Sequence, residues 1–325
     1  MKGLVALIVL TPALAAIDGA VVNRTTGKPQ PAATVTLYKL GQDGMESIES
    51  VKSDAAGRFA INQDLAGPRL IQAAYDGVTY NHMLPPGAPV KGITVDVYSA
   101  SKQPGGAKVA QHMVLLEPGG NGLAVSESFV WQNDGKTAFN DPDGGTLRFY
   151  VPPAGSKSLQ IMATAPQGMP IRRAPEKTGQ PDVYKVDFPI KPGESNIQVS
   201  YTLQFASPST FEGRIFFKGG PTSLIAPAGV QIKGENLVAR GQEPRTQASI
   251  FQVTGAAYKV EIEGAGTLKQ QQAAESEQGS GPQIQQILPK IYERKYWVLA
   301  LASAVLLLGF ILLYRAHQQP APRKK

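Results

Sequence analysis

Two histidine–methionine pairs, His82-Met83 and His112-Met113, are the residues whose types most resemble a metal-binding set. Imidazole nitrogens and thioether sulfurs are ligands that copper accepts, and no cysteine is needed beside them. Neighbouring residues on a strand point to opposite faces, so each pair offers one member to a given site. Two histidines without a third ligand are a thin basis for a tight site. The simpler interpretation places methionine in the core and histidine at the surface.

The sequence gives little support for a serine triad or for a catalytic pair of carboxylates. A serine triad needs histidine as its base, and neither His82 nor His112 lies near a Gly-x-Ser-x-Gly elbow. Acidic residues stand mostly in turns, where they cap and solvate, although spacing leaves open a carboxylate pair that meets in space.

Residues 140–145 (Asn-Asp-Pro-Asp-Gly-Gly) resemble a calcium loop, but Pro152 stands where the helical loop requires glutamate. A plain turn is therefore predicted there, with a calcium site built from distant acids as the alternative. We assign no catalytic, cofactor-binding or metal-ligating residue, expect no cofactor, and predict a protein that is not an enzyme.

Composition points to a protein made mostly of β-structure. The 325 residues are 42% hydrophobic, so part of the chain must fold around apolar cores. The 34 glycines and 26 prolines are scattered as turn dipeptides, which is typical of an all-β protein. Cysteine is absent, which excludes disulfides, thiol catalysis and iron–sulfur clusters.

The net charge of +7 is concentrated at the two ends of the chain. Eight of the 32 basic residues and one of the 25 acids lie outside residues 16–289, which leaves 24 of each in that body. Nucleic-acid binding needs a basic surface that neutralises phosphates. A neutral body excludes nucleic acid as a partner.

The N-terminus has the order of a secretory signal peptide. Lys2 precedes an apolar run that is too short to span a bilayer, and Pro12 and an Ala13-x-Ala15 pattern follow. We predict that residues 1–15 are a signal peptide; the alternative is a buried first strand.

A second apolar segment near the C-terminus predicts a membrane anchor. Residues 296–314 carry no charge, and a helix of this length covers roughly 28 Å, about the thickness of a bilayer core. Tyr296, Trp297 and Tyr314 mark the two interfaces, and residues 315–325 form a basic tail on the cytoplasmic side. The alternative of a buried core helix fits poorly, because a core helix would carry a polar face.

Between these segments the chain alternates in the manner of antiparallel sheets. In residues 17–98, Val35 and Leu37 alternate with threonines, and a turn precedes the alternating strand that contains Phe59. The residues that carry a family resemblance are Gly19-x-Val21, Gly27-x-Pro29, Ala33-x-Val35-x-Leu37, Ser53-Asp54-x-x-Gly57-x-Phe59 and Tyr75.

In these features, residues 17–98 resemble the carboxypeptidase regulatory-like domain, a transthyretin-like β-sandwich related to collagen-adhesin B-type repeats. The resemblance implies a fold and says almost nothing about function, since such sandwiches have many roles. No lysine occurs in residues 17–23, so the internal Lys–Asn isopeptide bond of some adhesin relatives is not expected.

Residues 107–206 contain six or more short strands and predict a second antiparallel sandwich of the immunoglobulin-like or transthyretin-like kind. Residues 209–268 predict either a small β unit of their own or extra strands on that sandwich. Residues 269–289 are rich in glutamine, alanine, serine and glutamate and predict a flexible linker. The expected fold is thus mostly β: tandem antiparallel β-sandwiches followed by one transmembrane helix.

These features together indicate a non-catalytic, single-pass protein of the bacterial cytoplasmic membrane. Its N-terminal domains would be extracytoplasmic (periplasmic) and its C-terminal tail cytoplasmic. We expect the sandwiches to bind another envelope protein or a cell-wall polymer, as an accessory subunit of a membrane complex or alone. A periplasmic copper or small-ligand carrier that uses His82 and His112 is the second hypothesis, and an exported hydrolase is the third.

Overall fold

The computed structural model describes residues 17–41, 44–63 and 67–268, and within them the chain is mostly β, as predicted. Apart from the 3-10 turn η1 (Pro153–Lys157), the regular elements of this part are strands. The signal peptide (1–15), linker (269–289), transmembrane helix (296–314) and basic tail (315–325) predicted above lie outside the described residues. Within the described ranges, no helix is long and apolar enough to cross a bilayer.

The N-terminal strands form two four-stranded sheets around one apolar core. One sheet contains β2 (Lys28–Pro29), β1 (Ile17–Asn23), β5 (Arg58–Ile61) and β8 (Ile93–Val97), and β1 and β8 run parallel. The other has the order β4 (Gly44–Lys52), β3 (Thr34–Gly41), β6 (Arg69–Tyr75) and β7 (Val78–Leu84), with antiparallel pairing. The inward residues of both sheets, Val35 and Phe59 among them, pack into this core.

A turn at the start of β5 shows what the Ser-Asp-x-x-Gly-x-Phe pattern does. The Asp54 carboxylate accepts hydrogen bonds from the backbone N–H groups of Ala56 and Arg58, each at 2.8 Å. Gly57 has φ +73°, and a Cβ there would lie 2.6 Å from the carbonyl oxygen of Val21. Glycine is required by both the backbone conformation and the close approach. These residues fix the turn that feeds β5 into the first sheet.

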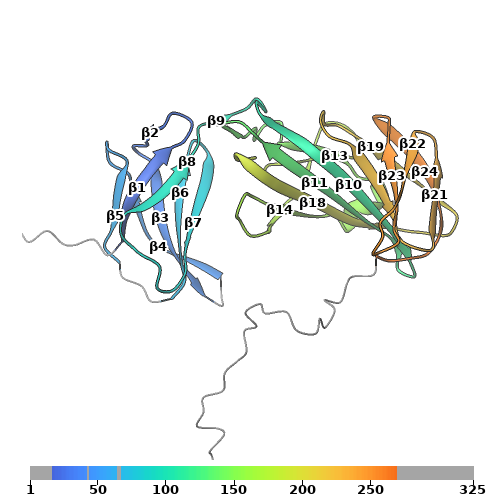
Figure 1. Cartoon of the computed structure of the whole chain (residues 1–325), viewed down its shortest axis with the longest axis horizontal. Helices are drawn as coiled ribbons and strands as arrows, with labels where there is room; N and C mark the ends of the chain where they lie inside the picture. The colour runs from blue at the N-terminus through green and yellow to red at the C-terminus, as the bar shows by residue number, and fades with distance from the viewer. Residues whose placement is uncertain (1–16, 42–43, 64–66, 269–325) are drawn as a thin grey trace, which may run out of the picture. The chain divides into compact units, whose positions relative to one another are not determined.

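The remaining strands build a larger sheet and three small ones. The eight-stranded sheet has the order β15 (Ile171–Arg173), β14 (Gln160–Thr164), β18 (Gly193–Leu203), β11 (Gly122–Asn133), β10 (Ala107–Gly119), β20 (Thr222–Ala226), β23 (Ser249–Val253) and β22 (Leu237–Gln242). The small sheets are β13 (Leu147–Tyr150), β17 (Val183–Val186) and β16 (Glu176–Lys177); β19 (Ser209–Arg214), β24 (Ala257–Gly264) and β21 (Val230–Gly234); and the pair β9 (Ala100–Ser101) and β12 (Ala138–Phe139). The long strands β10, β11 and β18 lie side by side (Figure 1).

Residues 209–268 contribute to this same large sheet. Strand β20 pairs in parallel with β10, and β23 and β22 continue the sheet beyond it. The apolar side chains of residues 107–262 form one core cluster, in which Phe211 and Ile262 pack with the residues of β11 and β18. Strands β20, β23 and β22 therefore belong to the large sheet, whereas β19, β24 and β21 form the separate three-stranded sheet.

The strand phase that the sequence predicts for the first core can be tested by truncating its side chains. Phe59 and Val35 are buried at 4% and 0% exposure, so Phe59→Ala and Val35→Ala should each lower the free energy of unfolding by about 2 to 5 kcal/mol. Urea unfolding of the purified protein measures this change. Thr79→Ala, at an exposed position of β7, is the matched control and should stay within about 0.5 kcal/mol. An unchanged transition for Phe59→Ala would contradict the assigned phase.

Candidate functional site

The structure places the two predicted copper ligands in different sheets and gives them different surroundings. His82 lies half-buried on β7, whereas His112 lies on β10 and is 2% exposed. Met83 is 47% exposed, so the expectation of methionine in the core and histidine at the surface is wrong for both Met83 and His112. Among the described residues no group of three or more histidines and acids is arranged to hold a metal ion.

Residues 140–145 form a turn whose charges are met by lysines. Asp141 Oδ1 accepts a hydrogen bond from the Gly144 N–H at 3.0 Å, and the Gly145 N–H donates to the Asp141 carbonyl oxygen at 2.8 Å. Lys102 Nζ lies 2.5 Å from Asp143 Oδ2, and this hydrogen-bonded ion pair lowers the pKa of Asp143. The Lys185 ammonium donates to the backbone carbonyl of Asp143 at 2.7 Å. This arrangement is a plain turn.

A buried chain of polar side chains crosses the eight-stranded sheet. His112 Nε2 lies 3.1 Å from Glu127 Oε2, and its Nδ1 lies 3.2 Å from Thr222 Oγ1. The Tyr201 hydroxyl donates to Glu127 Oε1 at 2.9 Å. All four residues are less than 9% exposed. We call Thr222, His112, Glu127 and Tyr201 the core polar chain.

Strand register is what brings these four residues together. Thr222 pairs directly with His112 across the parallel strands β20 and β10. Glu127 on β11 is one inward position away from the partner of His112, and Tyr201 on β18 is one inward position from the partner of Glu127. Inward positions recur every second residue, so the side chains form a diagonal over four adjacent strands.

Aromatic rings close the core polar chain off from water. The Phe129 ring stacks on the His112 imidazole at 4.1 Å between centroids, and the Phe217 ring meets it edge-on at 5.4 Å. Burial raises the pKa of Tyr201 well above its ordinary value, and the neighbouring Glu127 carboxylate raises it further. Each of the four side chains has a partner, as buried polar groups require. The core polar chain therefore stabilises the core. Both ring nitrogens of His112 already have hydrogen-bond partners.

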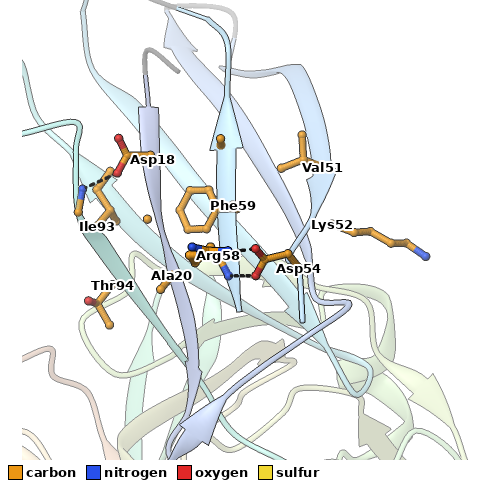
Figure 2. A pocket seen from close by; sticks show the side chains of 12 residues that line it. Asp18, Ala20, Val51, Lys52, Asp54, Arg58, Phe59, Ile93 and Thr94 are labelled. Carbon is orange, nitrogen blue, oxygen red and sulfur yellow. Dashed lines mark hydrogen bonds and ion pairs between the residues drawn. The ribbon is translucent and has the colours of Figure 1, made fainter. Parts of the chain in front are cut away.

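The first sandwich carries a shallow hollow of about 650 Å³ between β1, β5, β8 and the end of β4 (Figure 2). Its acidic groups are engaged: Asp54 pairs with Arg58 at 3.0 Å, and the Gly92 N–H donates to Asp18 Oδ1 at 2.9 Å. Figure 2 shows the Lys52 side chain directed away from Asp54. The polar groups of this hollow hold the turn and the strand ends.

Lys191 lines a second cavity, of about 300 Å³. Residues of β7, β8 and the turn after β14 also line this cavity: Tyr80, Asn81, His82, Thr94, Asp96 and Gln167. All of them belong to the same compact unit of the chain. We call this space the Lys191 cavity. Sequence reasoning missed Lys191, because nothing in its local pattern distinguishes it from a surface lysine in a turn.

The backbone around Lys191 is held in place on both sides. Ile190 exchanges two backbone hydrogen bonds with Phe139, at 2.9 and 3.0 Å, and its carbonyl oxygen accepts a third from Asn133 Nδ2 at 3.0 Å. Pro192 follows and restricts the backbone of Lys191 to extended conformations. These constraints fix the point from which the lysine side chain projects.

The Lys191 ammonium lacks a counter-charge among the described residues. Its Nζ lies 5.0 Å from the centroid of the Tyr80 ring, a cation–π contact, and Tyr80 donates its own hydroxyl to the Tyr98 carbonyl oxygen at 2.9 Å. Burial alone lowers the pKa of Lys191 from 10.5 to about 8. Asp96, the carboxylate of the cavity wall, is paired with Arg24 at 2.8 Å. The cavity thus presents a desolvated, unpaired amine to whatever enters it.

Comparison with known proteins adds no assignment. No family model matches this chain, and no curated protein matches it. Among solved structures, it is similar to an M1 zinc metallopeptidase from Deinococcus radiodurans, with 13% identity, a TM-score of 0.24, and coverage of 49% of this chain and 42% of that one. A single-residue variant of the same enzyme gives 13% identity, a TM-score of 0.24, and coverage of 48% and 42%. This chain spans less than half of that enzyme, and likeness at this level carries no argument.

The role of the core polar chain is tested by removing its central acid. Glu127→Ala leaves His112 and Tyr201 without their shared acceptor in the core, so the free energy of unfolding should fall by about 3 to 5 kcal/mol. Glu127→Gln keeps an acceptor oxygen and should cost less. Urea unfolding compares both with Glu261→Gln at an exposed position of β24, which should change stability by less than about 0.5 kcal/mol. A Glu127→Ala variant as stable as the parent would show that the core polar chain does not stabilise the fold.

Replacing Lys191, in contrast to Glu127, should stabilise the protein, and the gain in stability should depend on pH. Between pH 8 and pH 10.5 the unfolded chain binds more protons than the folded one, so stability rises with pH in this window. Below pH 8 the full cost of burying the ammonium is present. Lys191→Met should therefore raise the free energy of unfolding at pH 7 by about 2 kcal/mol, after allowance for the lost Tyr80 contact. The gain should disappear above about pH 10.5.

Urea unfolding at pH 7 and at pH 10.5 measures this difference. Lys39→Met, at an exposed position of β3, is the matched control and should show no such dependence. A Lys191→Met variant that is less stable than the parent at pH 7, or equally stabilised at both pH values, would contradict the unpaired amine.

Proposed function

We propose that this protein is a non-catalytic, single-pass protein of the bacterial cytoplasmic membrane whose extracytoplasmic β-domains bind a cell-wall polymer or another envelope protein. In this proposal, residues 1–15 are a signal peptide, residues 296–314 are the anchor and residues 315–325 lie in the cytoplasm. Residues 17–98 form a transthyretin-like sandwich of the carboxypeptidase regulatory-like kind, and a second sandwich follows it. Residues 269–289 are the linker between the sandwiches and the anchor.

The observation that most directly supports a binding role is the Lys191 cavity. Ligand sites in proteins are concave and place a few polar groups where a ligand can meet them, at volumes upward of about 300 Å³. The Lys191 cavity has this size and contains an ammonium that no described acid neutralises. The polar groups of the core polar chain, in contrast, are hydrogen-bonded to one another inside the core. The neutral body of the chain agrees with a partner other than nucleic acid.

Anchoring and envelope binding are tested together on the full chain. Membranes that contain the protein are washed with carbonate, and the protein extracted in mild detergent is then sedimented with insoluble cell-wall material or captured with its co-purifying proteins. We expect retention in washed membranes, release by truncation before Lys290, and specific recovery of wall material or of an envelope protein. The Glu127→Ala variant, whose core is destabilised, controls for binding by unfolded protein. A chain that leaves the membrane in carbonate, or that recovers neither wall material nor an envelope protein, would overturn the proposal.

A further inference from the structure

The Lys191 cavity contains an ammonium, unpaired among the described residues, that is not needed to pack the core or to set the register of the sheets. A buried cation is normally paired with an acid or hydrogen-bonded on all sides, because an isolated charge away from water is costly. Lys191 makes a ring contact with Tyr80 and has no hydrogen bond or ion pair to any described residue. The missing partner of this ammonium is an anion.

The groups around Lys191 define which anion would fit. Asn81, Thr94 and Gln167 line the cavity, and side-chain amides and hydroxyls of these types can exchange hydrogen bonds with hydroxyl groups of a ligand. Asn81 Oδ1 already accepts a hydrogen bond from Gln72 Nε2 at 3.0 Å. The Tyr80 ring supplies an aromatic surface, and Asp96 adds little negative field because Arg24 pairs with it. A volume of about 300 Å³ admits a group of the size of one sugar ring rather than a folded segment.

We propose that the Lys191 cavity binds the carboxylate of an acidic sugar unit, such as one hexuronate residue of an envelope polysaccharide. This inference rests on the proposed function and names its ligand class. The Lys191 ammonium pairs with the carboxylate, and the amide and hydroxyl side chains bond the sugar hydroxyls. Lysine acts here as a point charge that the ligand completes.

Ligand binding and protonation of Lys191 are linked in this arrangement. A carboxylate beside the amine favours its charged form and raises its pKa from about 8, so binding at pH 8 to 9 takes up a proton. The other titratable groups that face the cavity are Tyr80 and His82 from β7, Asp96 from β8, and Tyr98. The measurement is made at pH 8.5, close to the pKa of Lys191 in the unliganded protein, where proton uptake by its amine is readily detected.

Calorimetric titration of the purified full chain with glucuronate tests the proposal. At pH 7 we expect saturable binding of glucuronate, no binding of glucose, and weaker binding of N-acetylalanine, a peptide-like carboxylate without the sugar hydroxyls. At pH 8.5, heats measured in buffers of different ionisation enthalpy should show proton uptake. Lys191→Met should weaken glucuronate binding at least tenfold and remove the uptake, whereas Lys39→Met should change neither.

Because Lys191→Met is expected to be more stable than the parent, a loss of binding in this variant does not come from unfolding. Absence of glucuronate binding, or equal binding by the parent and by Lys191→Met, would overturn the inference. N-acetylalanine binding tighter than glucuronate would overturn the assignment to a sugar and point to a peptide carboxylate. If glucuronate fails while the detergent-extracted protein still sediments with wall material, the proposed function stands and this ligand class falls.

Discussion

A buried polar group costs free energy until another group meets it, and this constraint separates the two notable polar clusters of the described chain. In the core polar chain, Glu127 accepts hydrogen bonds from Tyr201 and from the His112 ring, and Thr222 occupies the second ring nitrogen. In the Lys191 cavity the ammonium lacks such an acceptor among the residues that the structure describes. The first cluster is complete within the fold, so it stabilises. The second is complete only with a ligand, so it points to function.

The first cluster depends on β-register more than on any local motif. Four strands from distant parts of the chain must align so that inward positions of β20, β10, β11 and β18 fall on one diagonal. A slip of one residue would send Glu127 to the outer face and leave an apolar side chain in water. In a chain without cysteine, burial and register hold the fold together, and a satisfied polar chain inside an apolar core favours one register over others.

The alternating pattern of the sequence predicts the strands and much of their phase, because period-2 burial is a local property. It places Val35 and Phe59 inward, where the structure has them. The same alternation indicates a buried His112, since His112 shares its phase with the inward Val114 and Leu116. An irregularity between Val109 and Gln111 shifts the register of β10 just before this point, which obscures the alternation.

The Lys191 cavity could not be predicted in this way. Its wall comes from β7 and β8 near residue 80 to 96 and from segments near residues 167 and 191, so only long-range folding brings them together. The parallel pairing of β10 with β20, which joins residues 209–268 to the large sheet, is non-local for the same reason. Local patterns predict where strands lie, but they do not predict which charged side chain is left without a partner after folding.

The central claim is that the half-buried Lys191 has no counter-charge among the described residues, and it is tested most directly by measuring the pKa of its amine. Lysine labelled with carbon-13 at Cε reports the protonation of its own ammonium in an NMR titration, and Lys191→Met assigns the resonance. We expect a titration midpoint at about pH 8, about 2.5 pH units below the ordinary lysine value of 10.5. A midpoint near 10.5 would contradict the claim.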